Sequence, residues 1–496
     1  MSDSRNQDSA SRRNGEATPL LPASNDQEYS ILTTYQKRLI ILGAALASAF
    51  SPLSANIYYP ALNSIAKDLR VTPSQVNLSI TTYMICQGIA PAFTGSLADQ
   101  AGRRPAYICC FSIYIVGNIA LALQHWFPAL LALRAVQSCG SSGTVALASA
   151  VAADIITSAE RGSYMGIASL GNIIAPSLGP IVGGVLSQYL GWQAIFWFLA
   201  IVAGAFFVPF LLFFPETCRS IVGNGSIAPS VWSRSLYSYM DQTTISAIPP
   251  APNSVRRLGI PNPWAALQLL FRRPLGLILL ANGAVFGSYY AVTAGIPAQY
   301  AALYHLNDLQ IGLCFIPAGL GSLLSATANG LIVDWNYRRT RLKAGLPVCY
   351  NQKHDMLTFP IERARLQIGL PMIGLAICTI AAYGYLIAQE TPLFIALMMV
   401  FLICFFITAA YNVMNILVVD LNYETPATAM AANNLVRCSL GAGAAAVVNP
   451  LIQRLGVQWT YLAVSGLLFV TSPLLLVVYT KGWGWRQKDA TMSESV

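Results

Sequence analysis

Residues 95–105 read GSLADQAGRRP, and this stretch decides the fold. It lies where one apolar stretch ends and the next begins, so we expect a short turn between two membrane helices. Arginine side chains hold such a turn on the cytosolic side and can pair with a carboxylate at a helix end. Glycines let the two helices approach closely. The residues of this loop that we single out are Gly95, Asp99, Gly102, Arg103 and Arg104.

The composition favours a membrane protein. The alternative is a soluble protein in which residues 95–105 form an ordinary basic loop. Of the 496 residues, 55% are hydrophobic and 10% are charged, and the mean hydropathy is +0.55. A soluble globular protein has about 25% charged residues. The net charge of +9 would suit nucleic acid, but the basic residues lie in loops between apolar stretches. We therefore expect a lipid bilayer around the protein and no nucleic-acid partner.

The ten cysteines indicate neither a disulfide framework nor a metal site. They are scattered, apart from the neighbours Cys109 and Cys110, and no CxxC pair occurs. We predict no metal and no cofactor. Asn77 and Asn224 begin Asn-x-Ser sequons. Asn77 lies close to the membrane, so its glycosylation stays open, and Asn224 is expected in the cytosol.

Twelve apolar stretches of about 20 residues, the length that crosses a bilayer, recur along the chain. In the first half they span 39–62, 77–97, 105–124, 129–154, 161–188 and 192–214. In the second half they span 275–302, 310–333, 367–388, 392–419, 426–453 and 457–480.

This count predicts an all-α membrane protein with one six-helix bundle at 39–215 and another at 275–480. A polar, proline-rich cytosolic linker at 216–274 joins the bundles. We expect a disordered cytosolic tail at 1–38, which has no cleavable signal peptide, and a second cytosolic tail at 481–496.

The placement of Lys and Arg residues gives the orientation. Lys67, Arg70 and Arg454 fall in loops expected outside, and Arg134 and Arg437 fall within spans. The other basic residues lie on the side of both termini, and the positive-inside rule makes this side cytosolic.

The two halves look like distant copies of each other. Residues 330–339, GLIVDWNYRR, place Asp334 before the pair Arg338 and Arg339, much as residues 95–105 place a carboxylate before an arginine pair. Two ordinary cytosolic loops are the alternative, but the six-plus-six count favours a repeat.

Residues 95–105 resemble the loop 2–3 signature of the major facilitator superfamily, although Gln100 stands where the family usually has a basic residue. The resemblance implies that this loop is a gating loop. The resemblance implies the major facilitator fold, with twelve transmembrane helices in two pseudo-symmetric six-helix bundles and the substrate cavity between them.

The fifth span resembles the antiporter motif that marks exporters in this superfamily. Small residues at this spacing let backbones touch, and a proline bends the helix. A generic packing helix is the alternative. The motif positions are Gly166, Ala175, Gly179, Pro180, Gly183 and Gly184.

Further motifs are similar to those of fungal twelve-helix drug:proton antiporters, of the quinidine-resistance type and the related organic-acid exporters. The fourth span carries Arg134 and Gln137 on one helical face, with Ser138 at a usual glycine. Residues 56–60 (NIYYP) and 215–217 (PET) match two more of their patterns. The resemblance implies a secondary active transporter that exports a small molecule by alternating access.

Charges inside the spans are the first candidates for a transport site. They are Arg134 and Arg437, whereas the acidic residues fall in tails, loops or helix ends. Two arginines without a carboxylate favour an anion, such as an organic acid or an acidic secondary metabolite. Protons stay a candidate coupling ion only if a vestibule reaches Asp154 or Asp420. The cavity and coupling candidates are Arg134, Gln137, Arg437, Asn433, Asn56, Tyr289, Tyr290, Tyr411 and Asn412.

Each candidate has a structural alternative. Arg134 would then pin helices through backbone carbonyls or Gln137, Arg437 would also be a helix pin, and each tyrosine would be packing. Asn415 shares the tenth span with Tyr411 and belongs to the same set of polar residues.

Other classes of function fit less well. A membrane enzyme needs reactive side chains clustered at one depth, and the spans have none, so we predict no enzyme. A receptor or channel does not need two matched halves. A broad-specificity multidrug:proton antiporter remains an alternative. The exporter motif of the fifth span argues against a transporter for sugar uptake. We expect a monomer in the plasma membrane that carries a small-molecule substrate.

Overall fold

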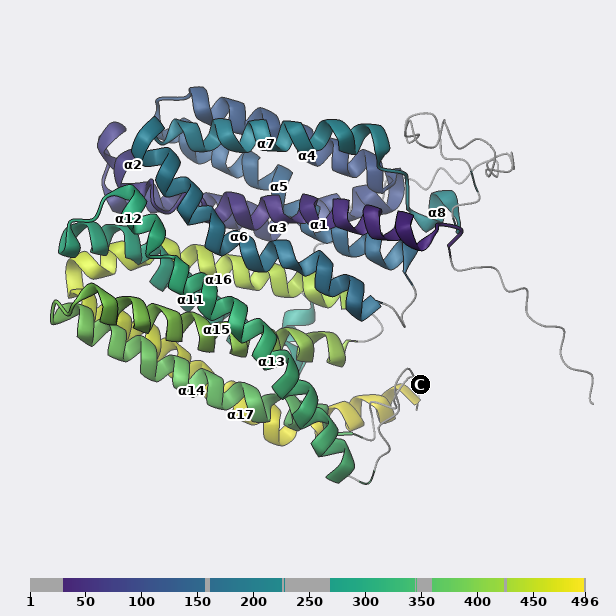
Figure 1. The fold of residues 1–496 in the computed structure, drawn as a ribbon. Coiled ribbons are helices and arrows are strands. Elements are labelled where there is room, and N and C mark those ends of the chain that lie inside the picture. Colours follow the sequence, from purple (N-terminus) through teal and green to yellow (C-terminus); the bar gives the residue numbers. More distant parts are fainter. Residues whose placement is uncertain are drawn as a thin grey trace, which may run out of the picture.

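The computed structural model describes residues 30–156, 161–224, 227, 268–343, 345, 359–422 and 426–494, and the regular structure in these ranges is helical (Figure 1). The first half contains α1 (Thr34–Asn56), α2 (Leu62–Asp68), α3 (Pro73–Ala101), α4 (Arg103–Leu123), α5 (Phe127–Ile155), α6 (Arg161–Leu190), α7 (Gln193–Phe213) and α8 (Arg219–Val222). The second half contains the 3-10 helix η2 (Leu269–Phe271), α11 (Leu275–Tyr304), α12 (Asp308–Leu313), α13 (Ile316–Lys343), α14 (Ile361–Ala388), α15 (Leu393–Leu421), α16 (Pro426–Leu455) and α17 (Val457–Glu494).

The prediction of an all-α fold built from twelve spanning helices is confirmed. In the described part of the chain, nine helices are long and apolar enough to cross a membrane, with α12 and α13 counted as one. The remaining three, α3, α5 and α6, are 29, 29 and 30 residues long. In α3 and α5, small and polar residues occupy many of the positions, whereas the described part of α6 contains the apolar segment Leu178–Leu190.

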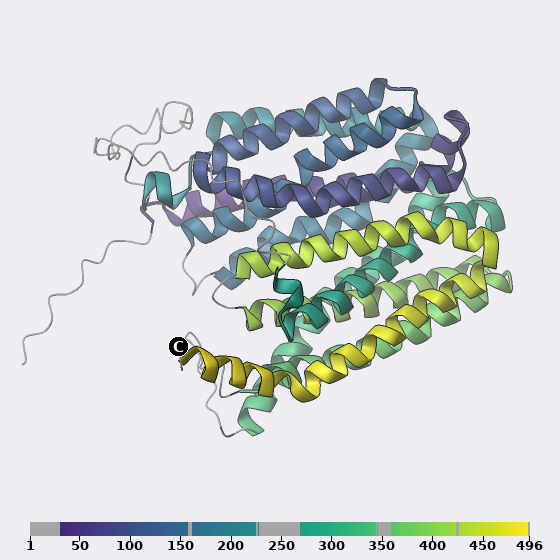
Figure 2. The ribbon, with the colours of Figure 1, turned by 180° about the vertical axis from the view of Figure 1, so that it is seen from behind.

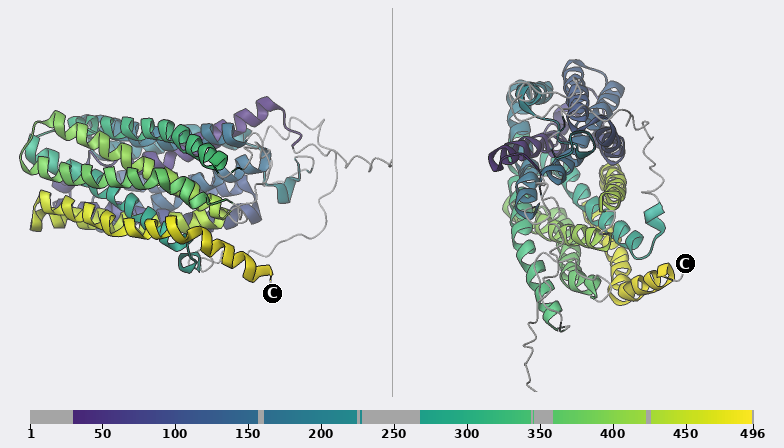
Figure 3. Two further views of the ribbon diagram at one scale, coloured as in Figure 1. Left: turned by 90° about the horizontal axis from the view of Figure 1, so that it is seen from below. Right: turned by 90° about the vertical axis from the view of Figure 1, so that its right-hand side faces the viewer.

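Several helices run further than the apolar stretches predicted, and two of them do so by ten residues or more at their C-terminal ends. Helix α13 continues to Lys343 instead of residue 333, and α17 continues to Glu494, through the segment we expected as a tail. Hydropathy marks only the part of a helix that lies in lipid. The backbone hydrogen bonds of the helix can continue into water for as long as no residue breaks them. Figure 3 shows α17 running past the rest of its bundle.

The connection between the second and third spans is shorter than predicted. Helix α3 ends at Ala101 and α4 begins at Arg103, so Gly102 alone forms the turn. Its φ of +112° lies in the region that favours glycine. Gly95 and Asp99 therefore belong to α3 rather than to a loop.

The two ends of the molecule differ. Helix α1 begins and α17 ends at the same end of the molecule (Figure 1). We name it the basic end because Arg103 begins α4, Arg365 lies in the second turn of α14, and Arg486 lies near the end of α17. Helices α2 and α12 lie at the opposite end.

The halves meet along a few helix pairs. Helix α3 packs against α16, and α6 packs against α12 and α13. Figure 2 shows α16, in yellow-green, beside the violet-blue α3. The buried core continues through both halves, from Ile41 in α1 to Leu475 in α17.

Candidate transport site and gates

The predicted gating loop forms a charge cluster at the basic end. Arg103 donates from Nη1 to Asp99 Oδ1 at 2.5 Å and from Nε to Asp154 Oδ2 at 2.8 Å. Asp154 comes from the end of α5, so the cluster ties three helices together. The Asp154 side chain is 11% exposed and that of Asp99 is 66% exposed, so the bond to Asp154 is the better shielded from water.

The Pro-Glu-Thr segment after α7 has a structural role in this cluster. Glu216 accepts backbone hydrogen bonds from Arg103 N at 2.8 Å and Arg104 N at 3.1 Å. These N–H groups lie in the first turn of α4, where they have no carbonyl partner within the helix and where a negative charge also interacts favourably with the helix dipole. A side chain at Gly102 would collide with the Glu216 carboxylate. The glycine is therefore required for the turn and for the cap.

The second half contains a cluster of the same kind around Arg365. Arg365, in α14, donates to Asp420 Oδ2 at 3.0 Å and lies 4.0 Å from Asp334 Oδ1. Arg365 thus takes the place that Arg103 has in the first half. The likeness of residues 330–339 to residues 95–105 did not include Arg365, which comes from the next helix.

The small residues of α6 lie at contacts between backbones. A Cβ at Gly179 would lie 3.1 Å from Ile57 N, and one at Gly183 would overlap the Ile57 carbonyl. A Cβ at Gly184 would lie 2.7 Å from the carbonyl oxygen of Asp308 in the other half. Ala175 and Pro180 are buried in the same helix, and Gly166 lies in its first part. The motif therefore packs α6 against α1 and against the second half.

Asp308 closes the opposite end. Its Oδ2 accepts hydrogen bonds from Ser64 and Ser187, each at 2.5 Å, and both serines belong to the first half. Asn63 also donates to the carbonyl of Pro297, at 2.8 Å. The sequence analysis treated Asp308 as a loop residue and missed it. The capping box of Asn307 and Gln310 predicts a helix start here, but not the contact between halves.

Arg134 is fully enclosed in the first half. Its guanidinium carbon lies 4.3 Å from the ring centroid of Tyr58 and 4.4 Å from that of Tyr83. Nη1 donates to Gln137 Oε1 at 2.6 Å and to the Ser54 carbonyl at 3.3 Å. These are the bonds expected of a helix pin. Nε and Nη2 have no hydrogen-bond partner in the described part of the chain, so the pin leaves two buried donors unused.

Arg437 is half-buried in α16, at the boundary between the halves. Nε and Nη2 donate to Asn434 Oδ1 at 2.9 and 2.7 Å, and Nη1 donates to the Tyr411 hydroxyl. Asn434 in turn donates to the Gln87 carbonyl of the first half, at 2.9 Å. The guanidinium carbon of Arg437 lies 5.0 Å from the ring centroid of Phe286. The described partners of this cation are therefore all neutral.

Three asparagines form a network one to two turns from Arg437, toward the basic end. Asn282 Nδ2 donates to Asn415 Oδ1 at 2.9 Å and to Asn433 Oδ1 at 2.8 Å, and Asn433 Nδ2 donates to Asn415 Oδ1 at 2.8 Å. Because two donors hold the Asn415 oxygen, its amide nitrogen is left to face away from the network. The sequence analysis missed Asn282, although an amide inside an apolar stretch was a visible signal.

The other candidates divide into neighbours of Arg437 and residues away from it. Tyr290 packs on Phe286 with ring centroids 4.8 Å apart, and Tyr289 packs on Tyr290 at 5.6 Å. Asn412 is half-buried in α15, next to Tyr411. Asn56 instead donates to the Pro52 carbonyl within α1, at 2.7 Å. The structure thus brings most second-half candidates together and keeps Arg134, Gln137 and Asn56 in the first half.

Asn77, the sequon residue, lies inside α3. Its side chain is fully buried, and Nδ2 donates to the Ala445 carbonyl of the other half at 3.2 Å. In this arrangement it is a packing residue between halves.

A family model described as Major Facilitator Superfamily matches residues 44–446. The MFS-type transporter phiD of Fungal sp. (strain ATCC 74256) is 44% identical over 472 residues, covering 94% of this chain and 72% of that protein. The MFS-type transporter tstD of Talaromyces stipitatus is 43% identical over 482 residues, covering 95% and 87%. Citrate exporter 1 of Aspergillus niger is 36% identical over 475 residues, covering 94% and 89%.

Solved structures share the fold. The human organic anion transporter MFSD10 (TETRAN) superposes with a TM-score of 0.54 at 17% identity, covering 88% of this chain and 98% of that one. A POT family transporter in complex with 5-aminolevulinic acid gives 0.62 at 16% identity, covering 90% and 96%. The prediction that the protein is a transporter and not an enzyme is confirmed by the family match and by the transporters among its relatives. With twelve spanning helices in two related halves and a family match over most of its length, the chain belongs to the major facilitator superfamily.

Proposed function

We propose that this transporter exports an anionic organic acid or acidic secondary metabolite across the plasma membrane by alternating access. The observation that carries the proposal is the state of Arg437. It lies at the boundary between the halves, is partly exposed, and is held by an amide and a hydroxyl rather than by a carboxylate. A guanidinium left without a counter-charge offers paired hydrogen bonds to an incoming carboxylate.

The asparagine network supports an approach from the basic end. Asn415 and Asn433 come between Arg437 and that end, because α15 ends there and α16 begins there. An outward-facing Asn415 amide would donate to a carboxylate or carbonyl oxygen on the way to Arg437. Neutral amides suit such a path because they hydrogen-bond an anion without holding it.

We further propose that the basic end is cytosolic. The positive-inside rule supports this orientation. Asp308, Asn63 and Gly184 join the halves at the opposite end, so the arrangement would be the inward-facing state. An epitope at either terminus should react with antibody only after the cells are permeabilised. Labelling of intact cells would reverse the orientation.

The names of relatives agree with an anion. One curated relative is a citrate exporter, and a protein of the same fold is an organic anion transporter. Proton coupling is part of the proposal only as an alternative to transport down the substrate's own gradient. Asp154 and Asp420 are the carboxylates that we consider for proton coupling. Each forms an ion pair with an arginine.

The proposal is tested by comparing culture media from cells with and without the gene. Mass spectrometry should find an acidic compound that leaves the cells only when the transporter is present. Re-expression of the wild-type chain should restore the release, and the Arg437→Gln variant should not at equal membrane abundance. If only cationic or neutral compounds depend on the gene, the anion assignment is wrong.

A further inference from the structure

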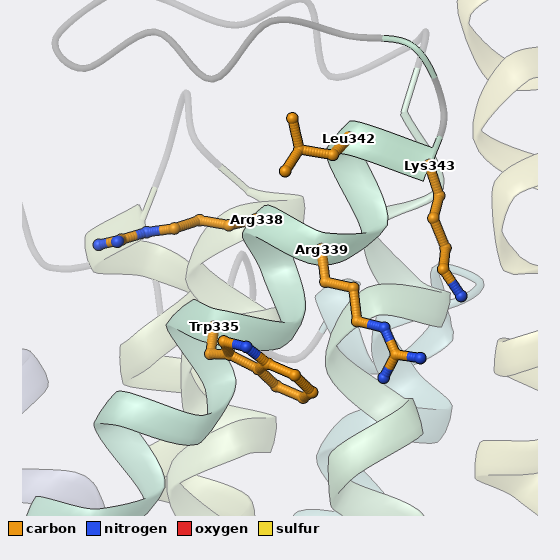
Figure 4. Close-up of a pocket in the computed structure, with 5 residues that line it drawn as sticks. All are labelled: Trp335, Arg338, Arg339, Leu342 and Lys343. Atoms are coloured by element: carbon orange, nitrogen blue, oxygen red, sulfur yellow. The ribbon is translucent and has the colours of Figure 1, made fainter.

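The basic end of α13 carries a recess whose lining comes from one helix. Trp335, Arg338, Arg339, Leu342 and Lys343 surround a volume of about 500 Å³ (Figure 4). Their spacing of three and four residues places them on one face of the helix. Figure 4 shows the Arg339 side chain extending on the same side as Trp335. The guanidinium carbon of Arg339 lies 5.2 Å from the Trp335 ring centroid.

The cation of the ion-pair cluster in this half comes from another helix. Arg365, in α14, pairs with Asp334 and Asp420. Arg341, on another face of the same helix, is buried against Tyr337 and Phe359. By contrast, Trp335 is 57% exposed and Leu342 66% exposed, and Arg339 and Lys343 are exposed beside them.

The order of residues along α13 follows the layers of a bilayer. Leu331 and Ile332, one turn before Trp335, are exposed apolar side chains of a spanning helix, 77% and 42% exposed, and suit acyl chains. Trp335 comes next, and tryptophan favours the interface between hydrocarbon and headgroups. The three cations follow at headgroup depth, where long side chains reach toward phosphate.

We propose that this face of α13 binds the headgroup of an anionic phospholipid. Arg338, Arg339 and Lys343 donate hydrogen bonds to the phosphate and to the second anionic group of the headgroup, and Trp335 packs against the glycerol region. One acyl chain lies along Leu331 and Ile332. The proposal uses the cytosolic placement argued above, where anionic lipids are enriched, but it does not depend on the substrate.

The test titrates the purified full-length protein in detergent with phosphatidylserine or phosphatidylcholine and counts bound lipids by native mass spectrometry. The wild type should bind phosphatidylserine in preference to phosphatidylcholine. The triple variant Arg338→Gln, Arg339→Gln, Lys343→Gln should bind phosphatidylserine roughly a hundredfold more weakly, because each cation near an anionic headgroup contributes about a fivefold factor.

Two further variants separate the site from general charge and from misfolding. Arg38→Gln with Lys481→Gln removes exposed cations from other helices of the same end and should leave the preference unchanged. Arg338→Lys with Arg339→Lys keeps the charge and should keep most of the binding. Equal binding by the triple variant and the wild type would overturn the proposal, as would a wild type without lipid preference. Neither result would touch the anion-export proposal, whose readout is transport.

Discussion

The Ser64 hydroxyl oxygen lies 2.5 Å from Oδ2 of Asp308, 244 residues further along the chain. Ser187 donates to the same oxygen, so one carboxylate joins two helices of the first half to the second half. A charge-assisted hydrogen bond of this kind contributes about 1.5–3 kcal/mol. Asp308 is therefore the main polar latch that we identify at the end opposite the termini.

Replacing Asp308 with Ala should shift the transporter toward the state open at that end, because both hydrogen bonds are lost. We would measure the labelling of a buried Thr293→Cys residue by a membrane-impermeant thiol reagent, in a background without reactive exposed cysteines. Labelling should become faster in Asp308→Ala. Asp68→Ala is the matched control, since Asp68 lies at the same end but bonds Trp192 within the first half. Equal labelling rates in the two variants would contradict the latch.

Substitution in α6 should stop transport by steric means. Gly179→Leu should abolish export at normal surface expression, and Gly183→Ala should already do so because its Cβ would overlap the Ile57 carbonyl. Gly204→Ala in α7 is the matched control, since no atom lies within 4 Å of its new Cβ. Export is compared at equal surface abundance. Full export by both α6 variants would leave these glycines without a functional role.

The two charge clusters at the basic end predict the same ranking in both halves. Asp154→Asn and Asp420→Asn should each lower the free energy of unfolding by about 1.5–3 kcal/mol, because the side chains of these aspartates are only 11% and 19% exposed. Asp99→Asn and Asp334→Asn should cost less than about 1 kcal/mol, because their side chains are 66% and 70% exposed. Thermal unfolding of the four purified variants checks the ranking. A reversed order in either half would show that the halves are not equivalent here.

Substitution of Arg134 distinguishes a role in transport from a role in packing. If Arg134 helps to set charge selectivity, Arg134→Ala should raise the apparent dissociation constant for the substrate about ten- to a hundredfold. Lys should rescue it only in part, because the ammonium keeps the charge and loses the planar fork. If Arg134 only pins Tyr58, Tyr83 and Gln137, folded yield should fall while the affinity of the remaining protein stays the same. Substrate binding and yield are measured on the same preparations.

Sequence patterns gave the helices and the two halves because a spanning helix must be apolar over a fixed length. They did not give the one-residue turn at Gly102, since the ends of α3 and α4 are polar and hydropathy does not detect them. They also did not identify Arg365 as the arginine of the second cluster. Asp334 and its partner Arg365 are brought together by packing, not by neighbouring positions in the chain.

The transport candidates show the same limit. Arg437 was visible as a charge in an apolar stretch, but its neutral partners Asn434 and Tyr411 come from two helices. Asp308 looked like a loop residue because it lies between the apolar stretches 275–302 and 310–333, and its contacts with Ser64 and Ser187 join segments far apart in the chain. Contacts between distant segments carry no periodic signal in one sequence.

The most direct test of the account is a counterflow assay in proteoliposomes. It compares the uptake of a labelled organic acid, such as citrate, with the uptake of a permanently cationic dye. We predict that excess organic acid on the inside drives uptake of labelled acid and not of the cation. Arg437→Gln should reduce acid uptake about ten- to a hundredfold, whereas Arg454→Gln, an exposed arginine of the same helix, should not. Robust transport of the cation, unchanged by Arg437→Gln, would contradict the account and would make this protein a multidrug exporter.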